Sequence, residues 1–180
     1  DDLGYGGYEV AVALFEGPVP RVERVERLDQ GEREAGRALG RKLAAGGAAE
    51  APTLLLYDSV RRSPPPVLNV GSHLMDGLNA ELPEGRHLWG AGVLADLELT
   101  RSLLFDGDGA VKQAAVALVL EGYRVDTVGR HGCEPVSAPM RITDIDGPVV
   151  KSIDGCRALD VILETAGLSV EAAKTSLSLW

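Results

Sequence analysis

The chain has 180 residues, 45% hydrophobic and 25% charged, an ordinary globular composition that excludes a disordered or fibrous protein. Its formal net charge of -9 argues against binding to nucleic acid or an anionic membrane, because neutralising phosphates requires clustered Lys and Arg. Two cysteines are too few for a disulfide framework and indicate reduced thiols in a cytoplasmic protein. The longest apolar run, residues 114–120, is too short to span a bilayer.

The first half of the chain alternates strand and helix signals. The elements expected are a strand over 8–15, a helix over about 29–45, a strand over 52–58 and a helix from Ser63 to about Leu82. Asp29 and Glu32 resemble a capping box at the start of the first helix. The charged stretch RVERVER before it, residues 21–27, is interpreted as a solvated face.

The second half is rich in short β-type runs. They lie at 87–92, 99–105, 110–120, 123–129, 140–145 and 149–153. Turns of the Asp-Gly type separate several of them, which indicates antiparallel hairpins. A helix is expected over about 156–166, ended by Gly167, and residues 169–179 again have helical spacing.

These elements predict a mixed α/β fold, with N-terminal strand–helix units followed by an antiparallel meander and with helices packed on the sheet or sheets. We expect one domain over 1–180. Its parts are a leading strand and helix over 1–50, a main segment over 51–167, and the start of a truncated helix over 168–180. The chain lacks an initial Met and a cap after its last helix, so it is expected to be a piece of a longer protein.

Five segments of the chain resemble the N-terminal half of the FIST domain when taken together and in order. They are PTLLLYDS (52–59), HLWGAGVLADLELTRSLLFDGDGAV (87–111), AAVALVLEG (114–122), HGCEPV (131–136) and IDGPVVKSIDGCRALDVILE (145–164). The resemblance implies a sensory module of bacterial signal-transduction proteins that binds a small molecule, with amino acids as proposed ligands. It also implies a C-terminal companion or output domain, and some members bind haem and sense nitric oxide.

The glycines of the WGAG segment are the first candidates for ligand contact. Gly90 and Gly92 would let the backbone approach a ligand closely, and Asp96 could receive the ammonium group of an amino acid. The alternative is a simple turn with a surface carboxylate. A dinucleotide-binding motif is rejected, because β-type residues follow where that motif needs a helix.

Arg101 and Ser102 are the second candidates, on the strand expected over 99–105. Arg101 could hold a ligand carboxylate through two parallel hydrogen bonds. The alternative is a solvated sheet face or a cross-strand ion pair, for instance with Asp126.

The GRHGCEP stretch contains the last two candidates, His131 and Cys133. The interpretations weighed are a glycine-flanked turn, a contact to a small ligand, haem ligation by His131, and a cysteine-dependent enzyme that uses Cys133. Zinc would need additional ligands, which the sequence does not place nearby. The sequence therefore predicts a sensor that binds a small ligand without catalysis and without a cofactor. The alternative hypothesis is a sensor that binds haem through His131.

Overall fold

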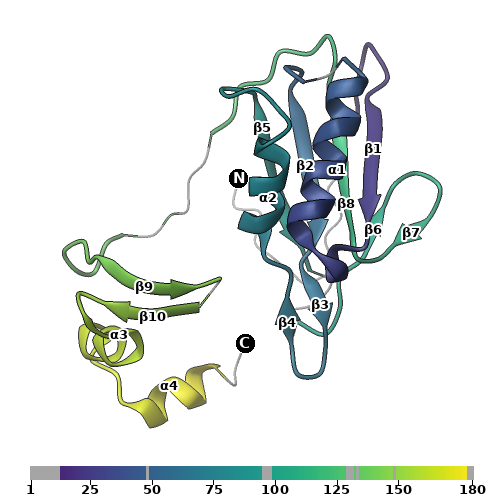
Figure 1. The fold of residues 1–180 in the computed structure, drawn as a ribbon. Helices are drawn as coiled ribbons and strands as arrows, with labels where there is room; N and C mark the ends of the chain where they lie inside the picture. Colours follow the sequence, from purple (N-terminus) through teal and green to yellow (C-terminus); the bar gives the residue numbers. More distant parts are fainter. Residues whose placement is uncertain are drawn as a thin grey trace.

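The computed structural model describes residues 13–47, 49–94, 99–128, 132, 134–147 and 149–177. Its centre is a four-stranded sheet (Figure 1) in the order β1 (Arg21–Glu26), β8 (Ala114–Val119), β2 (Thr53–Asp58) and β5 (Leu88–Val93). β8 runs antiparallel to both of its neighbours, whereas β2 and β5 are parallel. β8 is rich in Ala and Val and is buried along most of its length, as expected for a central strand covered on both faces.

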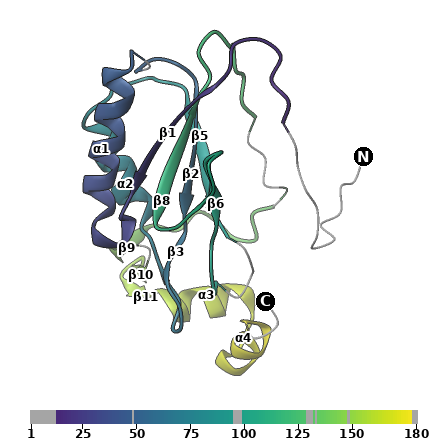
Figure 2. The same ribbon diagram turned by 90° about the vertical axis from the view of Figure 1, so that its right-hand side faces the viewer.

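Two helices, α1 (Glu32–Ala45) and α2 (Gly71–Asn79), cover one face of this sheet (Figures 1 and 2). Their apolar positions recur every three or four residues and form one core with the sheet, whose largest fully buried members are Leu28, Leu39, Leu43, Leu74, Leu78 and Val119. The helices approach closely at Gly36 and Gly77. A Cβ at Gly77 would lie 2.0 Å from the Arg33 carbonyl oxygen, so the contact requires glycine.

The other face of the sheet carries a smaller apolar cluster that includes Leu104 and Val116. Here the chain forms a short hairpin of β6 (Leu104–Phe105) and β7 (Ala110–Val111). A second hairpin, β3 (Val60–Arg62) with β4 (Val67–Leu68), extends from the carboxyl end of β2 and leads into α2.

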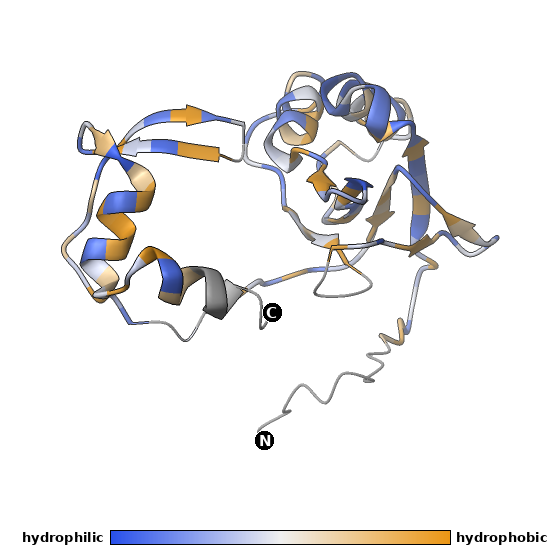
Figure 3. Cartoon of the chain, turned by 90° about the horizontal axis from the view of Figure 1, so that it is seen from below, coloured by the Kyte–Doolittle hydropathy of each residue, from blue (hydrophilic) through white to orange (hydrophobic). Residues whose placement is uncertain are grey.

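The C-terminal elements form a group of their own (Figure 1). They are the antiparallel strands β9 (Ile142–Asp146), β10 (Val149–Ile153) and β11 (Cys156–Arg157), followed by α3 (Ala158–Ala166) and α4 (Val170–Leu177). α3 packs on β10, and Ile153, Ala158 and Leu163 are buried there. Figure 3 shows hydrophobic positions along the strands and helices of this group. Many of its apolar side chains are exposed, among them Ile142, Ile145, Val149, Leu159 and Ile162.

The mixed α/β class is confirmed, as are the strand over 52–58, the helix ending at Gly46-Gly47 and the helix ending at Gly167. Gly167 adopts the left-handed conformation, and the Leu168 amide donates to the Leu163 carbonyl oxygen at 2.9 Å, which closes the last turn of α3.

The helix predicted from Ser63 to Leu82 is wrong in its first half. Residues 63–66, with three prolines, form the turn of the β3–β4 hairpin, and α2 begins only at Gly71. Asn69 and Val70 stay extended because their amides donate to the Ser59 carbonyl oxygen and to the Glu32 carboxylate. The predicted capping box is also wrong, since Gly31 precedes α1 and no side chain caps it.

Four further predictions differ from the structure. Residues 21–26 form the edge strand β1 and not merely a solvated face. Only the last two residues of the strand expected over 99–105 are extended in a ladder, and residues 123–128 form no strand. Tyr123 instead donates its hydroxyl to the Pro18 carbonyl oxygen and packs edge-on against Phe15. Of the strand expected over 8–15, residues 13–15 are irregular and the rest lies outside the described residues.

Candidate functional site

A hollow of about 650 Å³ lies between α2 and the edge strand β5. Its walls are mostly apolar, with backbone amides and a few hydroxyl and amide groups among them. The residues that line it are Leu55, Tyr57, Leu68, Asn69, Val70, Gly71, Ser72, Met75 and residues 88–92.

The floor of the hollow is bare backbone at Gly90 and Gly92. In the parallel register Leu55 lies beside Gly90 and Tyr57 beside Gly92, so both glycines occupy positions on the face that the helices cover. Gly90 does not tolerate a side chain, and one at Gly92 would require the Ser59 side chain to move. A Cβ at Gly90 would lie 1.7 Å from the Leu55 carbonyl oxygen, and one at Gly92 would lie 2.1 Å from the Ser59 hydroxyl oxygen.

The Tyr57 side chain forms the end of the hollow near the start of α2. Its hydroxyl oxygen would be 2.4 Å from a Cβ at Gly71 and 3.0 Å from one at Gly92, so the ring fits between two glycines. This hydroxyl forms no hydrogen bond with any residue of the described ranges. It is a hydrogen-bond donor and acceptor at the wall of a mostly apolar hollow.

The first turn of α2 adds free amides to the same end of the hollow. Val70 precedes the helix in an extended conformation, no side chain caps the helix, and its first turn carries no acidic residue. The Val70 carbonyl oxygen accepts from the amides of His73 and Leu74, so among the described residues the amides of Gly71 and Ser72 have no hydrogen-bond acceptor. A helix start of this kind favours an anionic group such as a carboxylate.

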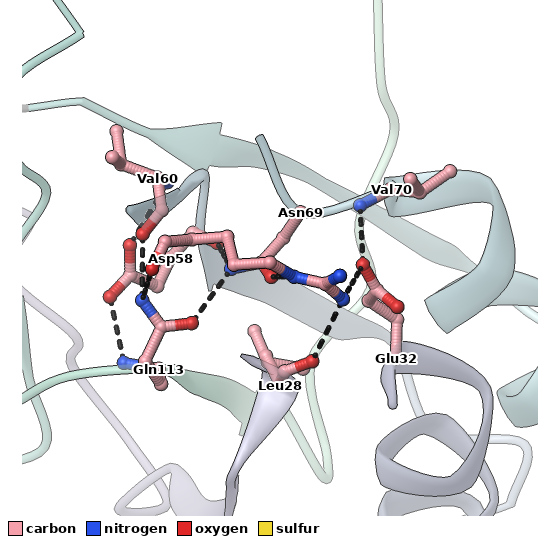
Figure 4. A network of polar contacts seen from close by, with 8 residues as sticks. Leu28, Glu32, Asp58, Val60, Asn69, Val70 and Gln113 are labelled. Atoms are coloured by element: carbon pink, nitrogen blue, oxygen red, sulfur yellow. Dashed lines mark hydrogen bonds and ion pairs between the residues drawn. The ribbon is translucent and has the colours of Figure 1, made fainter. Parts of the chain in front are cut away.

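A buried polar network lies at the carboxyl end of β2 and includes Asn69 and Val70, which also line the hollow (Figure 4). Asp58 is its centre: the carboxylate accepts from the amides of Val60 at 3.1 Å and Gln113 at 2.8 Å, and from the Ser102 hydroxyl. Burial raises the pKa of the Asp58 carboxyl above its ordinary value, and the two amide hydrogen bonds and the charge of Lys112 offset this in part.

Asn69 and Gln113 connect this carboxylate to the hairpin and to β8. The Asn69 side-chain amide donates to the Asp58 carbonyl oxygen at 2.8 Å and to the Gln113 side-chain oxygen at 3.1 Å. Gln113 in turn donates its side-chain amide to the carbonyl oxygens of Val60 and Arg61. Its backbone has a φ of 48°, a strained value that these bonds hold in place.

Glu32 and Arg61 form the other half of the network. The Glu32 carboxylate pairs with the Arg61 guanidinium at 2.6 Å and accepts from the Val70 amide at 3.0 Å. Burial alone would raise the pKa of Glu32, but hydrogen bonds from the amides of Val70 and Glu32 and the charges of Arg61 and His73 hold it below its ordinary value. The network therefore fixes Asn69 and Val70, and with them the start of α2, at the rim of the hollow.

Comparison with protein-family models matches residues 3–156 to the FIST N domain. The chain belongs to the FIST N domain family. Domains of this family are sensory domains of signal-transduction proteins, in which they bind small ligands. Searches of the curated proteins and of the solved structures returned no match. Across the described residues of this FIST N domain, no helix is long and apolar enough to cross a membrane.

The structure brings two of the seven sequence-predicted site residues, Gly90 and Gly92, into the hollow of this FIST N domain. Ser102 is buried and donates to Asp58. Arg101 is exposed and does not line the hollow, and Asp126 pairs with Arg124 at 3.5 Å. Asp96, His131 and Cys133 lie outside the described residues, so their roles stay predictions from the sequence.

The sequence prediction missed Tyr57, Gly71, Ser72 and Met75. Gly71 and Ser72 were missed because the helix was predicted to begin at Ser63, eight residues before its actual start at Gly71, which placed both residues in the helix interior. The signal available was the run of three prolines followed by Asn69, which favours a turn and an extended segment before the helix. No group of three His, Cys, Asp or Glu residues that could hold a metal ion occurs in the described part of the chain.

Proposed function

We propose that this FIST N domain senses a small molecule, without catalysis, by binding it in the hollow between β5 and α2. The volume of the hollow, about 650 Å³, carries the proposal. It falls within the range of roughly 300–1,000 Å³ that is usual for small-molecule sites, and its mostly apolar walls with few polar groups are also typical.

An amino acid is the ligand class that we propose. Its carboxylate would accept from the amides of Gly71 and Ser72 at the start of α2, and the Tyr57 hydroxyl is placed to bind a polar group of the ligand beside it. An apolar side chain would then lie along Met75 and Leu88. Asp96 as the partner of the ammonium group remains a proposal from the sequence.

The biological setting is proposed from the family. The domain would work in the cytoplasm of a bacterium and pass the binding signal to a C-terminal companion or output domain. Haem bound through His131 is the second candidate from the sequence. His73 and His87, the histidines of the described residues, do not line the hollow, whose walls offer only the Met75 thioether and the Tyr57 hydroxyl as groups that bind haem iron.

A thermal-shift screen of the purified domain tests the proposal. The twenty standard L-amino acids and haemin are added one at a time, and a ligand present at 100 times its Kd should stabilise the domain by about 2.7 kcal/mol. The screen is repeated on Ser72→Phe, which fills the hollow, and on Ala44→Phe, which adds the same side chain to the exposed face of α1.

We expect an amino acid to raise the melting temperature of the wild type and of Ala44→Phe, and to have little effect on Ser72→Phe. An equal shift in all three proteins would contradict binding in the hollow. A haemin-induced Soret band that is lost in His131→Ala would favour the haem alternative.

A further inference from the structure

Among the described residues, the outer side of β5 is an open strand edge. β5 is the last strand of the sheet order, its only neighbour being β2, and no other strand of the described residues pairs with it. Gly90 and Ala91, at its middle, are exposed. The strand carries no charged residue and no proline, the features that usually protect a sheet edge from pairing with another chain.

Two hydrogen bonds show which backbone groups point outward. The Thr53 amide donates to the His87 carbonyl oxygen at 2.9 Å, and the Ser59 amide donates to the Val93 carbonyl oxygen at 3.3 Å. Because backbone groups alternate in direction along a strand, the odd-numbered residues of β5 pair with β2. Leu88, Gly90 and Gly92 therefore direct their N–H and C=O groups to the open edge.

The sequence of β5 is complementary to itself in the antiparallel direction. If a two-fold axis passes at Gly90, this residue meets Gly90 of a second copy and exchanges both hydrogen bonds with it. Leu88 then lies opposite Gly92 of the second copy, and Trp89 lies opposite Ala91. Each large side chain thus faces a glycine or an alanine, an arrangement in which cross-strand neighbours pack without crowding.

We propose that two copies of this chain pair through β5, antiparallel and centred on Gly90, so that their sheets become one continuous sheet. An uncharged edge allows this approach without repulsion, whereas the charged edge of β1 opposes the same contact on the other side of the sheet. The pairing goes beyond the proposed function and does not depend on it.

One consequence concerns the hollow and does rest on the proposed function. Leu88 and Gly92 both lie on the helix-covered face, and Gly92 forms part of the floor. The second copy places its Leu88 opposite this Gly92, so it contributes a side chain to the outer wall of the hollow. Ligand binding and pairing are then expected to favour each other.

Light scattering after gel filtration tests the pairing itself on three proteins. Ala91→Glu places a carboxylate against the Trp89 ring of the second copy, and Val22→Glu adds the same charge to the β1 edge as a matched control. We expect dimers for the wild type and for Val22→Glu, and monomers for Ala91→Glu. A monomeric wild type, or a dimeric Ala91→Glu, would overturn the proposal.

Amide hydrogen exchange of the wild type keeps the test decisive if Ala91→Glu does not fold. On about a hundred-fold dilution the dimer dissociates by mass action. The amides of Leu88, Gly90 and Gly92 should then exchange much faster, while those of Trp89 and Ala91, which face β2, should change little. Exchange that does not alternate along β5, or that is independent of dilution, would overturn the proposal, as would a dimer that protects a different surface.

Discussion

The two edges of the central sheet differ in their side chains. β1, with the sequence RVERVE, carries two arginines that are both engaged: Arg21 contacts Glu23 and Glu121, and Arg24 contacts Glu26 and Asp106. β5, with the sequence LWGAGV, carries no charge and has two glycines beneath a hollow. Charged side chains discourage an added strand at β1, while β5 offers free backbone groups next to a site of suitable size for a ligand.

This difference assigns separate roles to the two sides of one sheet. On the β1 side, Arg24 pairs with Asp106 in the β6–β7 hairpin, and Arg21 donates to the Gly46 carbonyl oxygen at the end of α1. These contacts hold both elements against β1. The β5 side has a cavity in place of packed side chains. We therefore expect the stability of the fold to depend on the buried polar network of Asp58 and Glu32, and ligand binding to depend on β5.

The largest effect on stability is expected for a substitution of Asp58, whose carboxylate accepts hydrogen bonds from three buried or half-buried donors. Asp58→Ala leaves these donors without a partner, and we expect a loss of about 3 kcal/mol in the free energy of unfolding, measured by urea denaturation. Ser102→Ala removes one donor and should cost about 1 kcal/mol. Ligand binding that is lost in a stable, folded Ser102→Ala would instead support the sequence prediction that Ser102 contacts the ligand.

Glu32 should produce a smaller, pH-dependent effect. The pKa of Glu32 is lower in the folded protein than its ordinary value of 4.5, so its contribution is present above that pH and is lost as the pH falls through the folded pKa. Glu32→Gln should reduce the free energy of unfolding at neutral pH by about 2 kcal/mol and flatten its decline in acid. Denaturation curves from pH 7 to about pH 3 measure both changes; an unchanged acid slope would show that the ion pair with Arg61 contributes little.

The charged edge is tested by removing its charges. Arg24→Val together with Glu26→Val should lower the melting temperature moderately: the half-exposed Arg24–Glu26 pair contributes little, but the largely buried Asp106 side chain also loses its ion pair with Arg24. The double variant should nevertheless associate with increasing concentration, since the half of β1 from Arg24 to Glu26 would then carry no charge. If the variant keeps the oligomeric state of the wild type at all concentrations, the charges are not what protects this edge.

Tyr57→Phe should have the smallest effect on stability, within about 0.5 kcal/mol, since the hydroxyl has no hydrogen-bond partner among the described residues. The same change should weaken ligand binding, because it removes a polar group from the wall of the hollow. Thermal shifts with and without ligand measure both quantities. A large loss of stability with unaltered binding would mean that the hydroxyl serves the fold.

The elements that the sequence predicts well are those with an unambiguous local pattern. The apolar run of β2, the period of α1 and the ends at Gly46 and Gly167 all follow from local propensity. β1 is missed because its valines are three residues apart, which does not resemble the alternation of a half-buried strand. Pairing with the buried strand β8 decides its conformation, and this partner is far away in the sequence.

The site is only partly predictable for a related reason. Gly90 and Gly92 could be found, because glycines within a β-type run are unusual. The proline run indicates a turn before α2, but the exact start at Gly71 depends on Val70, which the Glu32 carboxylate holds extended through a contact between residues 38 positions apart. Likewise, the Ser102 hydroxyl is used in a hydrogen bond to Asp58, and no local sequence pattern predicts this contact.

The central claim is that the hollow at β5 is the binding site of this domain, and glycine amides report on it directly. With glycine labelled selectively by ¹⁵N, Gly71, Gly90 and Gly92 mark the hollow, while Gly40 and Gly46 mark α1 and its end near β1. On addition of the pooled standard L-amino acids we expect the resonances of the first three to move and those of Gly40 and Gly46 to stay. No movement, or movement confined to Gly40 and Gly46, would contradict the account.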